Sequence, residues 1–287
     1  MASRPVEITH RERLVFPDAG YTKGDLADYY SAIAPLILPF MAGRPVSLLR
    51  CPQGRDRNCF FQKHGGPGFG PPVHTIAIEE KSGETADYLY VEDEGGILQC
   101  VQMGAIEFHG WASLCSALEQ PDRLVFDLDP GEGLGFAEVK RAAVDVRERL
   151  AEEGLRSFAL LTGGKGVHVL VPLSPGHSWD SHSGFARRIA HELAGAGPDR
   201  FTATMSKEKR KGRIFVDWLR NARGATAIMP YSARARIGAP VAVPVSWDEL
   251  DGFGQAGAFT VGDIGTLKKR AGSGALKGWG EAGQKLP

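Results

Sequence analysis

The chain has 287 residues, of which 43% are hydrophobic and 24% are charged, enough for one large globular domain or two smaller ones. No apolar run approaches the ~20 residues that span a bilayer, and the start lacks the apolar core of a secretory signal, so we expect a cytoplasmic protein with no membrane contact. The 34 basic and 34 acidic residues leave no net charge, which argues against a generic binder of polyanions.

The first part of the chain is predicted to hold one helix and a series of short strands. Residues 25–37 have a helical pattern, with Thr22 or Asp25 as the cap and Pro35 and Pro39 limiting the end. Short strands are expected at 45–50, 73–78, 88–91, 97–103 and 106–109, with an irregular Gly/Pro-rich stretch at 65–72.

A different pattern begins near residue 122. A strand at 123–129 precedes a helix at 135–154, whose apolar positions recur every three or four residues and which Gly154 ends. Further strands are expected at 155–161, 167–171, 213–219 and 226–229, and a further helix at 181–194. From residue 252 the chain is rich in Gly and Lys with little periodicity. Mixed strands and helices with short, hairpin-like connections indicate an α+β fold.

The cysteines do not form a recognisable pattern. Cys51, Cys59, Cys100 and Cys115 are too few for a disulfide scaffold at this length, and no pair has the Cys-x-x-Cys spacing of a zinc site. We therefore expect four reduced thiols.

Two carboxylates stand at the end of the strand at 123–129. Asp127 and Asp129 are two residues apart, so on a strand they share a face, roughly 6–7 Å apart. Carboxylates this close repel each other unless positive charge lies between them, and ligands that are all oxygen suit a hard divalent cation. A bare Asp-x-Asp is also compatible with a strand that runs out into a solvated acidic turn.

A third aspartate follows in a later strand. Asp217 projects from the apolar stretch 213–219, where an unpaired carboxylate is costly. With Asp127 and Asp129 it predicts a two-cation site, in which the ions lie about 3.5–4 Å apart. A structural ion pair of Asp217 with Arg220 or Arg213 is the alternative.

Residues 162–168, Thr-Gly-Gly-Lys-Gly-Val-His, lie between two predicted strands. Glycines let the backbone approach a ligand and offer N–H groups to phosphate oxygens, and Lys165 adds a charge. The spacing is not that of a Walker A loop, and by itself the segment is equally compatible with a Gly-rich hairpin. Beside three carboxylates it favours a triphosphate-binding loop. Basic residues also cluster at 207–213 and 220–236, which suggests a basic groove or a solvated basic loop.

Six segments together resemble the polymerase domain of bacterial ligase D, a member of the archaeo-eukaryotic primase superfamily. They are 60–64 (Phe-Phe-Gln-Lys-His), 102–109 (Gln-Met-Gly-Ala-Ile-Glu-Phe-His), 121–131 (Pro-Asp-Arg-Leu-Val-Phe-Asp-Leu-Asp-Pro-Gly), 162–168, 214–221 (Ile-Phe-Val-Asp-Trp-Leu-Arg-Asn) and 230–234 (Pro-Tyr-Ser-Ala-Arg). The resemblance runs from about residue 7 to about residue 250, in the order of the family. No ligase or phosphoesterase module accompanies it, so we expect a stand-alone member or an excised domain.

The resemblance implies an α+β primase-polymerase fold, with two mostly antiparallel or mixed sheets flanked by helices around a central catalytic cleft. It implies a single catalytic domain at 1–250, with 1–120 contacting DNA and template and 121–250 forming the catalytic core. Residues 251–287 are expected to be a C-terminal extension that packs on the core and whose end is poorly ordered.

The family's site residues carry over by position. Asp127, Asp129 and Asp217 match its metal-binding carboxylates, which implies two Mn²⁺ or Mg²⁺ ions. The nucleotide contacts implied are Lys63, His109, Thr162, Gly164, Lys165, Gly166, His168, Arg210, Arg234 and Arg236. The family more often has Ser at Thr162, Lys207 and Arg213 are alternatives to Arg210, and a structural strand-end role is the alternative for His109.

The DNA contacts implied are Arg13, Lys23, Arg50, Phe60 and Phe61. Phe60 and Phe61 match an aromatic pair that stacks on template bases, although adjacent phenylalanines usually place one ring in the core. Arg13 and Lys23 align with a pocket for a 5′-phosphate. The chain departs from the family there, with His10 in place of a common Asn and Arg13 in place of a common Lys, but both side chains donate to phosphate.

The function implied is template-dependent nucleotidyl transfer that extends primers and fills short gaps in DNA repair by non-homologous end joining. The expected ligands are NTPs, preferred over dNTPs, and primer-template or gapped DNA with a 5′-phosphate; Ku and a separate DNA ligase are expected partners, at the nucleoid. The alternatives are a DNA-end or 5′-phosphate binding module without catalysis, and a two-metal nuclease or phosphatase. De novo primer synthesis is a third possibility within the same enzyme class.

Overall fold

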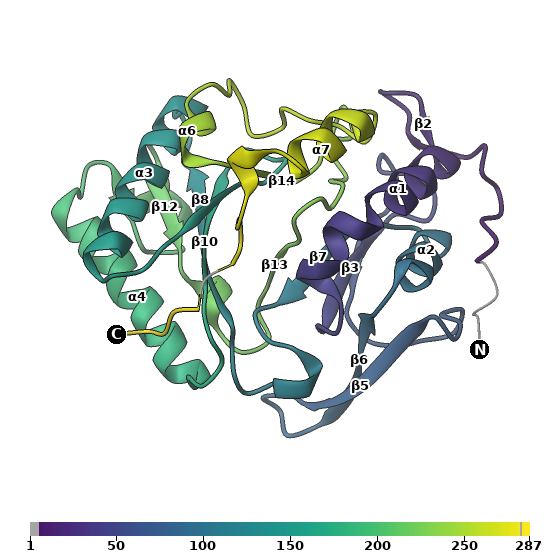
Figure 1. Cartoon of the computed structure of the whole chain (residues 1–287), viewed down its shortest axis with the longest axis horizontal. Helices are drawn as coiled ribbons and strands as arrows, with labels where there is room; N and C mark the ends of the chain where they lie inside the picture. Colours follow the sequence, from purple (N-terminus) through teal and green to yellow (C-terminus); the bar gives the residue numbers. More distant parts are fainter. Residues whose placement is uncertain (1–5, 282) are drawn as a thin grey trace. The chain divides into compact units, whose positions relative to one another are not determined.

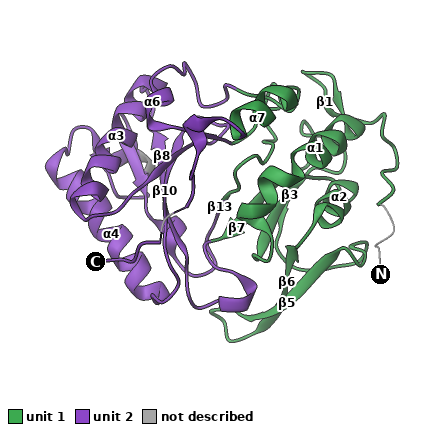
Figure 2. Cartoon of the chain, in the orientation of Figure 1, with its two compact units in different colours: residues 1–111, 228–242, 259–271 green, residues 112–227, 243–258, 272–287 purple. Residues whose placement is uncertain are grey.

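The chain divides into two units, neither of which is continuous in sequence (Figure 1, Figure 2). The computed structural model describes residues 6–281 and 283–287, apart from the side chain of Lys207. Unit 1 holds the chain up to residue 111, with 228–242 and 259–271. Unit 2 holds residues 112–227, 243–258 and 272–287.

Unit 1 combines short antiparallel strands with three helices. Strands β7, β3 and β4 are neighbours in that order in one sheet, and β1 with β2 and β5 with β6 form separate two-stranded sheets. Helices α2 and α7 both pack on α1. The elements are β1 (Leu14–Phe16), β2 (Tyr21–Thr22), α1 (Lys23–Met41), β3 (Val46–Arg50), β4 (Phe60–Gln62), β5 (Val73–Glu79), β6 (Thr85–Val91), α2 (Glu94–Gln102), β7 (Ala105–Trp111) and α7 (Ile264–Ala271). Strand β13 (Thr226–Ile228) spans the boundary between the two units' segments.

Helix α1 begins as predicted and continues further than expected. The side chains of Thr22 and Asp25 form a capping box at its start. Pro35 and Pro39 lie inside the helix, which ends at Met41. The predicted limit at residue 37 is therefore wrong, because burial of the face that includes Ile37 and Met41 outweighs the backbone hydrogen bonds that the prolines remove.

The strand predicted at 97–103 is a helix. In α2, Asp93 caps the start by accepting a hydrogen bond from the Gly96 backbone N–H. The buried residues Ile97, Cys100 and Val101 have the i, i+3, i+4 spacing of one helix face. That spacing outweighs the low helix propensity of the two glycines in the first turn.

Unit 2 is a six-stranded sheet in the order β11-β12-β8-β10-β9-β14. All neighbours are antiparallel except β11 and β12. Helices α3 and α4 pack on the sheet and on each other. The elements are η1 (Cys115–Ala117), β8 (Arg123–Pro130), α3 (Phe136–Glu152), β9 (Phe158–Leu161), β10 (Val167–Pro172), α4 (Trp179–Ala196), β11 (Phe201–Thr202), α5 (Lys207–Arg210), β12 (Ile214–Asp217), η2 (Leu219–Asn221), β14 (Val243–Val245), α6 (Trp247–Leu250) and η3 (Gly274–Leu276).

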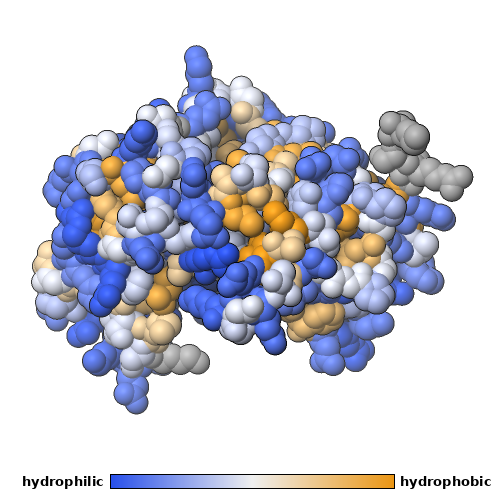
Figure 3. All heavy atoms as spheres, turned by 90° about the horizontal axis from the view of Figure 1, so that it is seen from below, coloured by the Kyte–Doolittle hydropathy of each residue, from blue (hydrophilic) through white to orange (hydrophobic). Residues whose placement is uncertain are grey.

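On the face shown in Figure 3, hydrophilic residues are interrupted by separate hydrophobic patches. Among the described residues, no helix is long and apolar enough to cross a membrane.

Candidate active site

The predicted metal-binding carboxylates lie on two neighbouring strands of unit 2, and the predicted nucleotide contact His168 lies on a third. Strand β8 lies between β12 and β10, and its Asp127 is paired in register with Asp217 on one side and His168 on the other. Residues paired across antiparallel strands point to the same face, so Asp217, Asp127 and His168 form a row across the sheet. Asp129 stands two residues further along β8, on the same face.

This cluster concentrates negative charge in a buried place. Asp127 and Asp217 are each only 8% exposed. Burial and the neighbouring Asp127 raise the pKa of Asp129 to about 6, against the opposing charges of His168 and Arg220. Burial is also the main reason why the pKa of Asp217 is raised. A cation at this place would relieve both the burial cost and the repulsion.

A guanidinium supplies part of that positive charge. Arg220 Nε lies 3.2 Å from Asp217 Oδ2, and Arg220 Nη2 lies 3.4 Å from Asp127 Oδ2. On the other side of Asp127, His168 Nε2 lies 3.4 Å from Oδ1. The ion pair of Asp217 with Arg220, which the sequence left open as an alternative, is therefore present and extends to Asp127.

The three carboxylates are the kind of ligand that a divalent cation prefers, but their side chains do not converge on one point. Three carboxylates offer only oxygen ligands, as Mg²⁺ and Mn²⁺ prefer. Within the described residues, however, no three acidic, histidine or cysteine side chains converge as a ready metal site. With Arg220 against two of the carboxylates, these contacts have to open before an ion can bind there.

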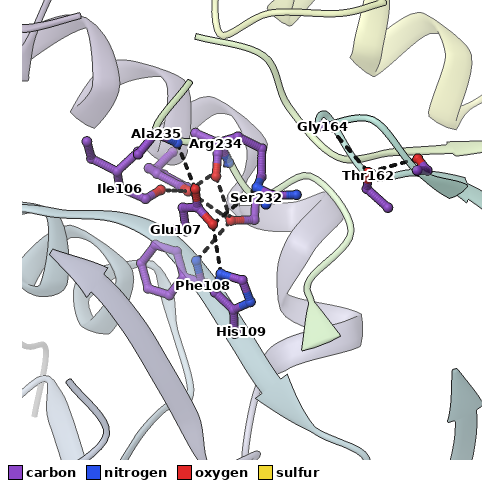
Figure 4. A network of polar contacts seen from close by, with 12 residues as sticks. Ile106, Glu107, Phe108, His109, Thr162, Gly164, Ser232, Arg234 and Ala235 are labelled. Carbon is purple, nitrogen blue, oxygen red and sulfur yellow. Dashed lines mark hydrogen bonds and ion pairs between the residues drawn. The ribbon is translucent and has the colours of Figure 1, made fainter. Parts of the chain in front are cut away.

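The predicted triphosphate loop lies directly against β8. A Cβ on Gly166 would stand 2.4 Å from the Leu128 carbonyl oxygen and 3.4 Å from Asp129 Oδ1, so only glycine permits this approach. The Thr162 hydroxyl donates to the Gly166 carbonyl at 2.8 Å and accepts from Gly164 N–H (Figure 4). A donor role for Thr162 toward phosphate requires that first bond to open. Lys165 is exposed on the loop.

The basic segment 207–213 also packs against the end of β8. A Cβ on Gly131 would meet the Arg210 carbonyl oxygen at 1.8 Å, so the two backbones touch there. The Arg210 guanidinium lies 3.6 Å from the ring centroid of Phe215, the cross-strand partner of Asp129. Arg210 is thus held beside the carboxylates. The side chain of Lys207, one alternative to it, lies outside the described residues.

In unit 1, one carboxylate that the sequence analysis missed holds two of the predicted residues. Glu107 Oε2 lies 2.8 Å from His109 Nε2 and accepts from Arg234 Nε at 3.1 Å, while Oε1 accepts from Ala235 N–H (Figure 4). Glu107 and His109 are two residues apart on β7, a same-face spacing that the sequence already contained. Arg236 is exposed two residues beyond Arg234.

Lys63 has a partner of its own. Its ammonium lies 2.7 Å from Glu80 Oε1 and donates to the Tyr88 hydroxyl. The hydrogen bond from Lys63, with those from Tyr88 and His64, lowers the pKa of Glu80 to about 2. A nucleotide contact by Lys63 therefore competes with this surface ion pair.

The aromatic pair of unit 1 is open to solvent. Phe60 is 45% exposed and Phe61 is 63% exposed, so the expectation that one ring lies in the core is wrong. Strand β4 is short and lies at the edge of its sheet, which leaves both rings uncovered. Arg50 lies against the Phe60 ring, and Phe61 meets His109 edge-on with ring centroids 5.3 Å apart.

The three predicted cationic DNA contacts of unit 1 meet in one cavity of about 200 Å³. Arg13, Lys23 and Arg50 line it, and its described lining contains no carboxylate. Arg13 and Lys23 are fixed by hydrogen bonds to the carbonyl oxygens of Pro52 and Thr9. Burial and the charge of Arg13 lower the pKa of Lys23. Such a cavity suits a small anion.

One residue of the cavity wall, Cys51, forms a disulfide. Cys51 and Cys59 are bonded to each other, so the expectation of four reduced thiols is wrong for this pair; Cys100 and Cys115 are not disulfide-bonded. The pairing follows from the strand register, because Arg50 on β3 is opposite Phe60 on β4 and the cysteines flank that pair.

Comparisons with known proteins show which family the chain resembles. The family model "LigD, primase-polymerase domain" matches residues 22–273. The chain is 41% identical over 250 residues to the multifunctional non-homologous end joining protein LigD of Pseudomonas aeruginosa, covering 87% of this chain and 30% of that protein. It is 37% identical over 254 residues to the LigD of Mycobacterium tuberculosis (strain H37Rv), covering 86% and 33%. The chain thus spans about a third of the length of these curated relatives.

A solved structure extends the agreement to the fold. The polymerase domain from Mycobacterium tuberculosis ligase D, in complex with DNA, superposes with a TM-score of 0.87 at 33% identity, covering 96% of this chain and 98% of that one. The expected α+β fold and the polymerase class of enzyme are confirmed by these matches. The resemblance seen in the sequence is confirmed as well, and the chain belongs to the family of LigD primase-polymerase domains.

Proposed function

We propose that this chain is a template-directed nucleotidyltransferase that extends a primer across short gaps and at broken DNA ends. The reaction joins the primer 3′-hydroxyl oxygen to the α-phosphorus of an NTP or dNTP and releases pyrophosphate. The observation that carries the proposal is the row of Asp217, Asp127 and His168, with Asp129 beside it and the glycine loop pressed against the same strand.

Asp127, Asp129 and Asp217 are the residues that would hold two divalent cations, Mn²⁺ or Mg²⁺. When bound, such ions supply activation of the attacking hydroxyl and neutralisation of the leaving phosphates. The residues of the chain then act by positioning and charge rather than by covalent catalysis.

The cationic residues around this cluster are suited to the phosphates of the nucleotide. Lys165 stands exposed on the loop, and the backbone N–H groups of Gly164 and Gly166 are close by in the same turn. Arg210 is held over Phe215. In unit 1, Glu107 fixes the ring of His109 and the guanidinium of Arg234, which together with Arg236 and Lys63 complete the proposed nucleotide contacts.

The DNA contacts lie in unit 1. The cavity lined by Arg13, Lys23 and Arg50 would receive the 5′-phosphate of the downstream strand. The exposed rings of Phe60 and Phe61 would stack on template bases, an interaction worth about 1–3 kcal/mol per base that tolerates any sequence.

We place this activity in non-homologous end joining, because the relatives are named for that process. The proposed partners are Ku and a separate DNA ligase at the nucleoid. A preference for ribonucleotides is part of the proposal.

The test is extension of a labelled primer on a gapped duplex with a 5′-phosphate, given NTPs or dNTPs and either Mn²⁺ or Mg²⁺. We expect extension by one or a few nucleotides, more with NTPs. Asp127→Ala should abolish extension with little effect on binding of the gapped DNA. Asp145→Ala, which removes a surface carboxylate paired with Arg200, is the matched control and should leave both unchanged.

The same assay separates the alternatives. An unextended primer, beside an active relative as positive control, contradicts the polymerase proposal. DNA binding without extension would favour the binding module, and shortening of the labelled strand would favour a nuclease.

A further inference from the structure

The side chain of Arg220 lies within 4 Å of two of the predicted metal ligands, Asp127 and Asp217. Its guanidinium bridges Asp217 and Asp127 from the side of β12, while His168 flanks Asp127 from β10. The side chain is 40% exposed, whereas those of the two carboxylates are 11% exposed. Buried acids are therefore capped by a cation that reaches solvent.

The backbone of Arg220 is fixed on both sides. Before it, Leu219 N–H donates to Asp217 Oδ1 at 3.0 Å. After it, the fully buried side chain of Asn221 takes the place of a strand residue: it accepts from Val125 N–H and donates to Val125 O, both at 2.7 Å. Strand β12 stops at Asp217, so this substitute pairing holds η2 against β8.

Asn221 is itself held from behind. The buried ring of His182 contacts the Asn221 carbonyl through Nδ1 and the Arg123 carbonyl through Nε2. The Arg220 side chain projects from between these anchored neighbours toward the two carboxylates. The backbone hydrogen bonds on either side therefore fix the Arg220 Cα beside the carboxylates. The position of the guanidinium depends instead on the charged groups that it pairs with.

We propose that Arg220 is a built-in counter-ion that competes with the divalent cation for Asp127 and Asp217. The inference rests on the proposed function, because it requires that these carboxylates take a cation. Without the cation, the guanidinium offsets the repulsion of the buried acids. When the cation arrives, the guanidinium leaves toward solvent and stands at the edge of the site, where it can pair with a phosphate.

Two properties of arginine make this competition effective. Its guanidinium stays protonated at all working pH values, so the competing charge is always present. The long side chain and its exposure allow it to swing aside without moving η2. The absence of a converged metal site among the described residues agrees with this, since two of the three carboxylates are engaged with the guanidinium.

The test measures metal binding without DNA or nucleotide. Titration of the whole chain with Mn²⁺, followed by electron paramagnetic resonance of the free ion, gives the affinity; thermal unfolding of the metal-free chain gives its stability. Arg220→Gln should bind Mn²⁺ about three- to tenfold more tightly, the range expected for removing two partly screened ion pairs. Its metal-free form should unfold at a lower temperature, and added Mn²⁺ should raise that temperature by more than in the wild type.

Two variants control the experiment. Arg220→Lys keeps the positive charge but loses the fork that reaches both carboxylates, so its Mn²⁺ affinity should lie between those of the wild type and Arg220→Gln. If Arg220→Gln does not fold, NMR of the wild type serves instead: Mg²⁺ should shift the Arg220 side-chain signal, which is assigned by its absence from the spectrum of Arg220→Lys. Arg223→Gln removes the next arginine, which pairs with Glu119, and should leave Mn²⁺ affinity unchanged.

The outcomes distinguish this inference from the function on which it rests. If the wild type binds Mn²⁺ and Arg220→Gln binds it equally or more weakly, Arg220 orients the carboxylates instead of competing, and the inference is wrong. An Arg220 NMR signal that Mg²⁺ leaves in place also overturns it. If neither the wild type nor the variant binds Mn²⁺, the result contradicts the proposed metal site itself, and with it the inference about Arg220.

Discussion

Among single residues, Glu107 determines how two cations of unit 1 are oriented. Its side chain is only 5% exposed, yet it is ionised at neutral pH. Burial alone raises the pKa of Glu107, but the hydrogen bond with His109, the charge of Arg234 and the Ala235 N–H outweigh burial and lower the pKa to about 2. A buried carboxylate with this many donors keeps His109 and Arg234 in fixed directions.

This pKa predicts a pH dependence of stability. The pKa of Glu107 is lower in the folded chain than the ordinary value of 4.5, so its contribution is complete above pH 4.5 and is lost as the pH falls toward 2. The shift corresponds to about 3 kcal/mol at pH 7, of which about 2 kcal/mol is lost by pH 3. The difference in free energy of unfolding between wild type and Glu107→Gln, measured by urea denaturation, should shrink by about that amount between pH 7 and pH 3.

Glu119→Gln, which removes an exposed carboxylate paired with Arg223, is the matched control. A difference between wild type and Glu107→Gln that stays constant with pH would show that Glu107 does not carry this linkage.

The sequence predicted the chemistry of single residues better than their partners. Asp127 and Asp129 share a face because of strand periodicity alone, which a sequence displays. The position of Asp217 beside Asp127 depends on β12 pairing with β8 across some 90 residues. No local pattern displays that pairing, so the shared site was a hypothesis from residue chemistry that the family resemblance supported. Local patterns did contain Glu107, and the possible pair of Asp217 with Arg220, but not the second contact of Arg220 with Asp127.

Among the elements, the end of β8 depends on close contact between backbones. The segment that carries Arg210 touches Gly131, where no side chain fits. Helix α4 offers the opposite case in the same unit: Gly184 lies in its interior, and a Cβ there would meet no atom within 4 Å. Packing therefore requires glycine at position 131, whereas Gly184 only lowers the stability of its helix.

These glycines give a paired prediction. Gly131→Ala should destabilise the chain by about 1–3 kcal/mol, because the backbone of Arg210 has to move. Gly184→Ala should stabilise it by about 0.5–1 kcal/mol, since alanine restricts the unfolded chain and favours the helix. Thermal or urea unfolding of both variants shows whether the free energy of unfolding falls in the first and rises in the second. An unchanged stability of Gly131→Ala would mean that the contact with Arg210 is loose in solution.

Helix α2 shows why element type was harder to predict than fold class. Its nine residues include two glycines and several β-branched or apolar residues, a composition that favours a strand. The cap at Asp93 and the burial of Cys100 favour the helix instead. Burial depends on the tertiary structure, so the local sequence does not display it. The number and order of strands in unit 2 nevertheless made the α+β class clear.

For the whole molecule, zero net charge means that DNA binding has to come from where charges are placed. A neutral chain gains little long-range attraction to a polyanion, so its affinity depends on a few local phosphate contacts. The cavity of Arg13, Lys23 and Arg50 is such a place, with three cations and no carboxylate among its described lining residues. The division of the chain into DNA-binding and catalytic parts, expected from the sequence, stays a prediction.

This charge distribution predicts recognition of a single terminal phosphate. Wild type should bind a gapped duplex with a 5′-phosphate about tenfold more tightly than one with a 5′-hydroxyl, the scale of a charge-assisted hydrogen bond. Arg13→Gln should remove most of that preference while leaving affinity for the 5′-hydroxyl duplex nearly unchanged. Arg13 borders the cavity, and its loss removes one charge without unpairing a carboxylate.

Arg57→Gln, a change at an exposed arginine beside Asp56, is the matched control and should keep the preference for the 5′-phosphate. Fluorescence anisotropy with the two duplexes measures both affinities at one salt concentration. Equal binding of the two duplexes by the wild type would show that the cavity does not read the phosphate, and a neutral chain would then need another source of affinity for DNA ends.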